Sequence, residues 1–73
     1  MPRIKIVTKT LKEPVVVEGA TNGEWLNADN TPSKAPEGSF MFIAFYNDAS
    51  AANERRIVAK FIGPEVIGFV TES

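Results

Sequence analysis

The side chains in this sequence with the clearest capacity for chemistry are basic residues near its N-terminus. Arg3, Lys5 and Lys9 occupy odd positions, so they share one face if the segment is a β-strand. Arg55 and Arg56 form a second basic group later in the chain. Cations grouped in this way neutralise nucleic-acid phosphates or pair with acidic protein surfaces. We therefore predict that these residues belong to a partner-binding surface.

Two aromatic residues are candidates to complete such a surface. Trp25 lies just before a polar loop, and Tyr46 ends the most apolar stretch of the sequence. An exposed tryptophan commonly anchors a protein interface, and either ring would serve as a platform for a stacked base. A tryptophan also commonly packs in a core or anchors a loop. We include Trp25 among the partner-binding candidates, with both interpretations open.

The sequence contains no cysteine and no histidine. This excludes Ser–His and Cys–His catalysis, cysteine redox chemistry and disulfide bonds. A zinc site built from carboxylates alone is rare. Ser33 and Lys34 are adjacent, but a catalytic lysine needs a buried site and this pair lies in a proline-rich loop. We therefore predict a protein that is not an enzyme and that uses neither a cofactor nor a metal.

The charged residues are unevenly distributed along the chain. The formal net charge is −1 and the isoelectric point is about 5.3. Residues 1–12 contain four basic and no acidic residues, whereas residues 13–37 contain five acidic residues and one lysine. The acidic segment counts against a protein that binds nucleic acid chiefly through its charge.

Length and hydropathy indicate one small domain over residues 1–73. The first residues are not followed by the apolar run of a signal peptide, and residues 40–46 are far too short to cross a bilayer. The lack of cysteine suits a reducing compartment. We therefore expect a cytoplasmic protein with no membrane partner and, because the chain begins with Met1, a complete small gene product.

The other elements are organised around the apolar stretch 39–46, Ser-Phe-Met-Phe-Ile-Ala-Phe-Tyr. If this stretch is a strand, its even-numbered and odd-numbered residues face opposite ways, and both sets are apolar. A strand with two apolar faces is covered on both sides. We therefore predict a central strand with both faces largely buried, Phe40 and Tyr46 included.

Alternating residues with many β-branched side chains predict a first strand over residues 3–10. Ile4, Ile6 and Thr8 form its apolar face. Residues 15–20 begin with three valines, which are also β-branched, and they predict a second strand, antiparallel to the first.

Asn22-Gly23 is a typical two-residue hairpin turn, because a type I′ turn needs positive φ at both central positions. It predicts a short strand over residues 24–28 that returns beside the second strand. Residues 29–38 contain two prolines and one glycine and show no apolar periodicity, so we predict a flexible loop there.

Residues 48–62 are compatible with two structures. A helix near residues 50–62 would have one apolar side and would end at Gly63-Pro64. A strand is favoured by the β-branched residues around Ile57, but its alternation is poor because both faces are apolar. We predict the helix, followed by a last strand over residues 65–71.

Together these elements predict an α+β fold, in which a mostly antiparallel sheet of about four to five strands carries one helix on one face. If the last strand lies parallel beside the central strand, the helix is a right-handed crossover. If residues 56–62 form a strand instead, the alternative is an all-β small barrel of the SH3-like or OB-like kind.

From these features we expect a small protein–protein interaction module. Compact chains of this composition are common among bacterial and bacteriophage regulators that dock on a larger host machine such as RNA polymerase. Basic residues would steer the approach, and steric blocking or pairing at an exposed strand edge would act on the partner. One alternative is a nucleic-acid-binding domain that uses the basic first strand with Arg55 and Arg56. Another is a structural subunit of a larger assembly.

Overall fold

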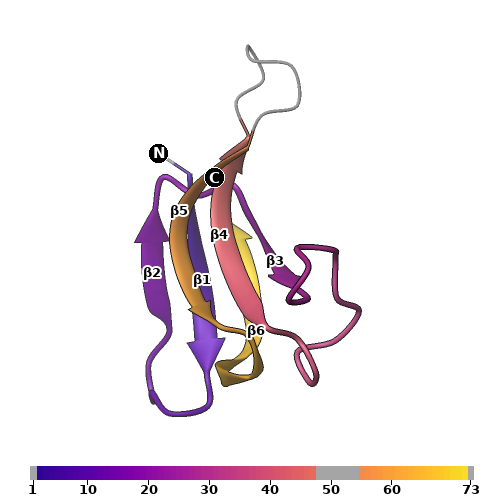
Figure 1. The fold of residues 1–73 in the computed structure, drawn as a ribbon. Helices are drawn as coiled ribbons and strands as arrows, with labels where there is room; N and C mark the ends of the chain where they lie inside the picture. Colours follow the sequence, from indigo (N-terminus) through magenta and orange to yellow (C-terminus); the bar gives the residue numbers. More distant parts are fainter. Residues whose placement is uncertain (1, 48–54, 73) are drawn as a thin grey trace.

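The computed structural model of the protein describes residues 2–47 and 55–72. This part of the chain contains six β-strands and one 3₁₀ turn (Figure 1). No helix in it is long and apolar enough to cross a membrane. The elements are β1 (Arg3–Thr8), β2 (Val15–Glu18), β3 (Asn22–Leu26), β4 (Met41–Asn47), β5 (Arg55–Ile62), the 3₁₀ turn η1 (Gly63–Glu65) and β6 (Val66–Glu72).

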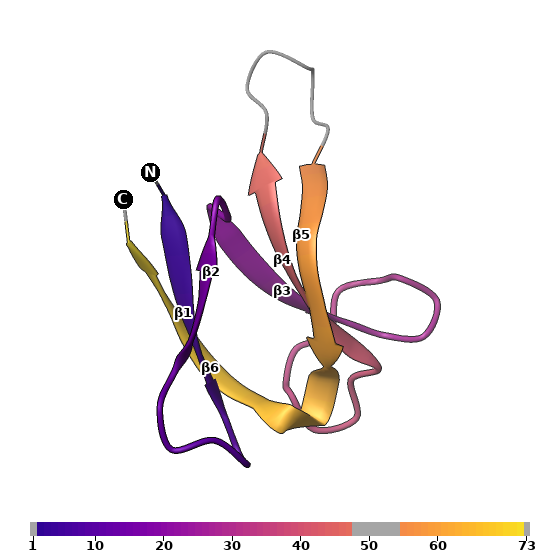
Figure 2. The same cartoon turned by 90° about the vertical axis from the view of Figure 1, so that its left-hand side faces the viewer.

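The strands form two antiparallel sheets of three strands each. Sheet A has the order β2-β1-β6, and sheet B has the order β3-β4-β5. Figure 2 shows the two sheets on opposite sides of the molecule. The main hydrophobic cluster takes residues from both, among them Ile4 and Ile6 of β1 and Phe42 of β4. We call the face of each sheet that contributes to this cluster its inner face, and the opposite face its outer face.

The first strand follows its sequence pattern. Ile4 and Ile6 are fully buried and Thr8 is nearly so, which confirms the predicted apolar face of β1. The predicted antiparallel pairing with the second strand is also confirmed, with Ile4 opposite Val17. Strict alternation fixes which side chains face the core, because successive residues of a strand point to opposite faces.

The apolar stretch forms a central strand, as predicted: this is β4, and the structure gives it β3 and β5 as neighbours. Phe42 and Ala44 are fully buried on its inner face, and Ile43 and Phe45 are buried on its outer face, so both faces are covered. The prediction fails at the ends of the stretch. Phe40 precedes β4 and is 59% exposed, and Tyr46, near its C-terminal end, is 39% exposed.

The predicted hairpin at Asn22-Gly23 is wrong. Both residues lie inside β3, and β2 and β3 belong to different sheets and are not paired with each other. The chain turns between the sheets at Gly19, which has φ of +86°. Gly23 is required for a different reason, because a Cβ at this position would collide with the ring of Phe42.

The predicted helix is also wrong in the part that the structure describes, since residues 55–62 form β5. Its proposed start, in residues 48–54, lies outside the described residues. Gly63-Pro64, interpreted as a helix end, instead begins the 3₁₀ turn η1.

A β-bulge explains why the alternation of β5 looked poor. Ala59 pairs with Ala44, but the next residue of β4, Phe45, pairs with Ile57, so Val58 is an extra residue. The bulge shifts the inside–outside pattern by one residue. Lys60 and Ile62 share the outer face with Ile57, although their numbers differ in parity.

The last strand is confirmed as an element, with β6 starting one residue later than predicted. It does not lie beside the central strand. It pairs antiparallel with β1, so no crossover helix is needed. The α+β prediction is therefore wrong, and the described residues form an all-β structure of two three-stranded sheets, the class that the strand interpretation implied.

We predict that Gly23→Ala lowers the free energy of unfolding by about 1–3 kcal/mol, because the added methyl group overpacks the core against Phe42. Gly68→Ala is the matched control, since a Cβ at Gly68 meets no atom within 4 Å. Urea unfolding measures both variants. Equal stability of Gly23→Ala and the wild type would contradict the role assigned to Gly23.

Candidate functional site

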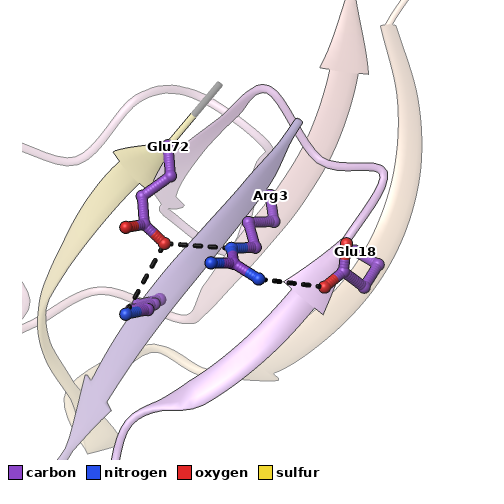
Figure 3. A network of polar contacts seen from close by, with 4 residues as sticks. Arg3, Glu18 and Glu72 are labelled. Carbon is purple, nitrogen blue, oxygen red and sulfur yellow. Dashed lines mark hydrogen bonds and ion pairs between the residues drawn. The ribbon is translucent and has the colours of Figure 1, made fainter. Parts of the chain in front are cut away.

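The basic residues of the first strand are paired with carboxylates from both neighbouring strands. Arg3 Nε donates a hydrogen bond to Glu72 Oε1 of β6 at 3.0 Å, and Arg3 Nη1 lies 3.7 Å from Glu18 Oε1 of β2. Lys5 Nζ lies 3.6 Å from the same oxygen of Glu72. Figure 3 shows Arg3 on β1 between the two carboxylates. The register explains the contact, because Glu18 and Glu72 are the cross-strand partners of Arg3.

This arrangement changes the electrostatics of the outer face of sheet A. Two cations and two carboxylates of similar exposure balance each other, so this row of charges is not a strong anion-binding surface. Each exposed pair contributes little to stability. Lys9 is not part of the row, since it follows the end of β1, where its backbone N–H donates to the carbonyl of Glu65.

The pKa of the Glu72 carboxyl is lowered chiefly by the hydrogen bond from Arg3; desolvation opposes this effect, and the charges of Lys5 and Arg3 lower the pKa further. The ionised form of Glu72 is therefore favoured in the folded protein. This contribution to stability is present at neutral pH and is lost as pH falls through the pKa of the folded state.

Trp25 packs between the two sheets. Its Nε1 donates a hydrogen bond of 3.1 Å to the carbonyl of Val66 on β6. Its ring centroid lies 4.9 Å from that of Phe42 and 5.6 Å from that of Phe69. This geometry favours the core interpretation of Trp25 over that of an exposed anchor.

The second basic group lies on the other sheet. Arg55 forms an ion pair with Glu24, and its guanidinium carbon lies 5.0 Å above the ring centre of Phe45. These contacts cover the outer face of β4 at Phe45. Arg56 pairs across the strands with Tyr46, and both are exposed. The structure therefore does not combine the N-terminal basic residues and the arginine pair into one surface.

The strands at the sheet edges differ in how far their free edges are occupied, which the sequence did not reveal. The edge of β3 is partly occupied, because Ser33 N–H donates to Trp25 O and Asn27 N–H donates to Thr31 O. On β6, the carbonyl of Val66 accepts from Trp25. The edge of β2 is short, at four residues. The strand β5 has eight residues, and among residues 2–47 and 55–72 it pairs with β4 alone. Within this part of the chain, the other edge of β5 therefore has no strand beside it.

The open strand carries three exposed apolar side chains, and others lie on sheet A, among them Ile67 and Val70 of β6. Ile57, Val58 and Ile62 are 48%, 44% and 69% exposed. The eight residues of β5 include three basic residues, Arg55, Arg56 and Lys60, and no acidic one. We call β5, with its unpaired edge and these side chains, the β5 edge. The sequence analysis did not predict the β5 edge, because it assigned these residues to a helix. The only sequence signal for a strand here was the β-branched pair at 57 and 58.

Comparison with known protein families, curated proteins and solved structures finds no match for this chain. Within the described residues, no cluster of three or more acidic side chains is placed to hold a metal ion. A functional hypothesis for this protein therefore depends on its surfaces.

We predict that Glu72→Gln reduces stability near pH 7 and that the difference from wild type shrinks at a pH below the lowered folded-state pKa of Glu72, where the carboxyl is uncharged in both folded and unfolded states. Urea midpoints at the two pH values measure the effect. Glu37→Gln, in the exposed loop before β4, is the control and should show no such change. A pH-independent effect of Glu72→Gln would contradict the assigned ion pairs.

We predict that Trp25→Phe lowers the free energy of unfolding by about 1 kcal/mol or more, because the carbonyl of Val66 loses its donor. Tyr46→Phe removes a polar group from an exposed ring and should change stability by less than about 0.5 kcal/mol. Thermal or urea unfolding compares the two variants. If both are equally stable, Trp25 does not link the sheets as described.

Proposed function

We propose that this protein is a small, non-enzymatic module that binds a larger protein through the β5 edge. The observation that carries the proposal is that β5, a strand of eight residues, pairs with β4 alone among the strands that the structure describes and has three exposed branched apolar side chains. Long apolar edges are normally blocked or covered, because their unpaired N–H and C=O groups are a template for another strand.

Binding at this edge follows from the geometry of a sheet. In an antiparallel pair, every second residue of an edge strand turns its N–H and C=O groups away from its neighbour. An added strand satisfies these groups, and its side chains contact those of the edge strand on both faces. Ile57 and Ile62 would contact such a strand from the outer face of sheet B. When a segment of the partner pairs with β5, that segment can no longer pair with a competing strand. Binding would modulate the partner in this way.

The charge pattern favours a protein partner over a nucleic acid. Arg3 and Lys5, the residues first considered for phosphate contacts, are held by Glu18 and Glu72. Nucleic-acid affinity comes chiefly from cations that are available to neutralise phosphates. A surface of exposed branched aliphatic side chains is more typical of a protein contact.

We predict that Ile62→Glu lowers capture of the partner from a lysate of the source organism by about tenfold or more, because it places a charge in the apolar contact. Val70→Glu is the matched control, since Val70 is also exposed on an edge strand but lies on the outer face of sheet A. Quantitative mass spectrometry of captured proteins is the measurement, and unfolding curves establish that both variants fold.

Equal capture by Ile62→Glu and the wild type would refute binding at the β5 edge. Loss of capture only in Val70→Glu would place the interface on sheet A.

A further inference from the structure

We infer that the segment bound by the β5 edge is an extended, acidic strand of another protein. The inference rests on the proposed function and specifies the chemistry of the partner. Arg55, Arg56 and Lys60 lie within one strand that has no acidic residue of its own. The side chain of Glu24 pairs with Arg55.

The register of sheet B predicts how the partner's side chains are arranged. Lys60 lies on the outer face, between Ile62 at one end and Ile57 beyond the bulge. A strand beside β5 shares its two faces, because cross-strand neighbours point the same way. The partner would therefore present an acidic residue opposite Lys60 and apolar residues opposite the two isoleucines.

The inner-face side of β5 requires a complementary pattern. Phe61 is half-buried opposite Phe42, whereas Arg56 is exposed opposite Tyr46. An adjoining strand would place an apolar side chain near Phe61 and a second acidic residue near Arg56. Apolar and acidic residues that alternate on both faces make the partner segment β-prone as well as negatively charged.

A second copy of this chain fits the edge less well. Pairing β5 with β5 of another molecule would bring together two strands that each carry Arg56 and Lys60, besides Arg55 with its partner Glu24, and that have no acidic residue of their own. Like charges at close range oppose such an association.

Nucleic acid also fits the distribution of these cations poorly. Arg55 and Lys60 lie on the outer face, whereas Arg56 pairs with Tyr46 on the opposite side of the strand. A groove that follows a phosphate backbone needs its cations on one continuous surface. Cations on both faces of β5 instead suit a partner strand that has carboxylates on both of its faces.

The test is selection of binding peptides from a random displayed library by the intact protein, followed by synthesis of the enriched sequence. We predict enrichment of sequences in which Val, Ile, Thr or Tyr at one position is followed two residues later by Asp or Glu, so that apolar and acidic residues alternate on each face of the bound strand. Lys60→Glu should weaken binding of the synthetic peptide by about tenfold, measured by fluorescence anisotropy at low salt. Lys12→Glu makes the same charge change in an exposed connection outside sheet B and should leave binding unchanged.

Backbone pairing is tested with two N-methylated forms of the same peptide. Methyl groups on alternate residues in one frame block the hydrogen bonds to β5, whereas methyl groups in the other frame face away. Loss of binding in one frame only supports strand addition.

The outcomes separate the inference from the proposed function. Enriched peptides that are basic or proline-rich, or that bind equally well in both methylated frames, overturn the acidic-strand inference while Ile62→Glu can still impair binding. Peptide binding that is unaffected by Ile62→Glu overturns both. Self-association that Lys60→Glu changes would identify a second copy of the chain as the occupant. Salt-sensitive binding of a single-stranded oligonucleotide that is tighter than binding of any peptide would identify a nucleic acid. Either result would overturn the inference.

Discussion

The packing of Phe42 is the interaction on which the rest of the structure depends. This residue is fully buried, and its ring centroid lies 4.9 Å from that of Trp25 on β3, 5.3 Å from that of Phe69 on β6 and 6.3 Å from that of Phe61 on β5. It therefore joins sheet A to sheet B. In a small chain without disulfides, such aromatic contacts supply much of the stability. The ring fits only because Gly23 has no side chain.

The functional proposal follows from how the two sheets use their surfaces. The inner faces form the core, and the outer face of sheet A balances its own charges through Arg3, Lys5, Glu18 and Glu72. The loop after β3 occupies part of the edge of that strand, and the Trp25 side chain bonds to the carbonyl of Val66 at the start of β6. Within the described residues, the β5 edge combines backbone that pairs with β4 alone, exposed apolar side chains and three basic residues, of which Arg55 is paired with Glu24. A single extended segment can satisfy all three of these properties.

Much of the fold could be predicted from the sequence where local pattern and tertiary structure agree. The first, second, central and last strands lie where alternation and β-branched residues indicated them. The failures have specific causes. Asn22-Gly23 matched a turn motif, but Gly23 serves the packing of Phe42. The bulge at Val58 disrupted the alternation of β5, so a strand resembled a one-sided helix. The candidate site was largely missed, because it lies on that misassigned strand and only Arg55 and Arg56 of it were singled out.

The sequence by itself determined that one face of β1 and both faces of β4 are buried, because alternation is a property of neighbouring residues. It also excluded catalysis that depends on histidine or cysteine, because neither residue occurs. The pairing of β1 with β2 could be predicted, but only the tertiary structure decided the other strand neighbours. The bond from Arg3 to Glu72 spans 69 positions, and no local pattern encodes such a contact. The same long-range pairing neutralised the basic strand that the sequence emphasised and left β5 with an open edge, since both outcomes depend on which strand lies beside which.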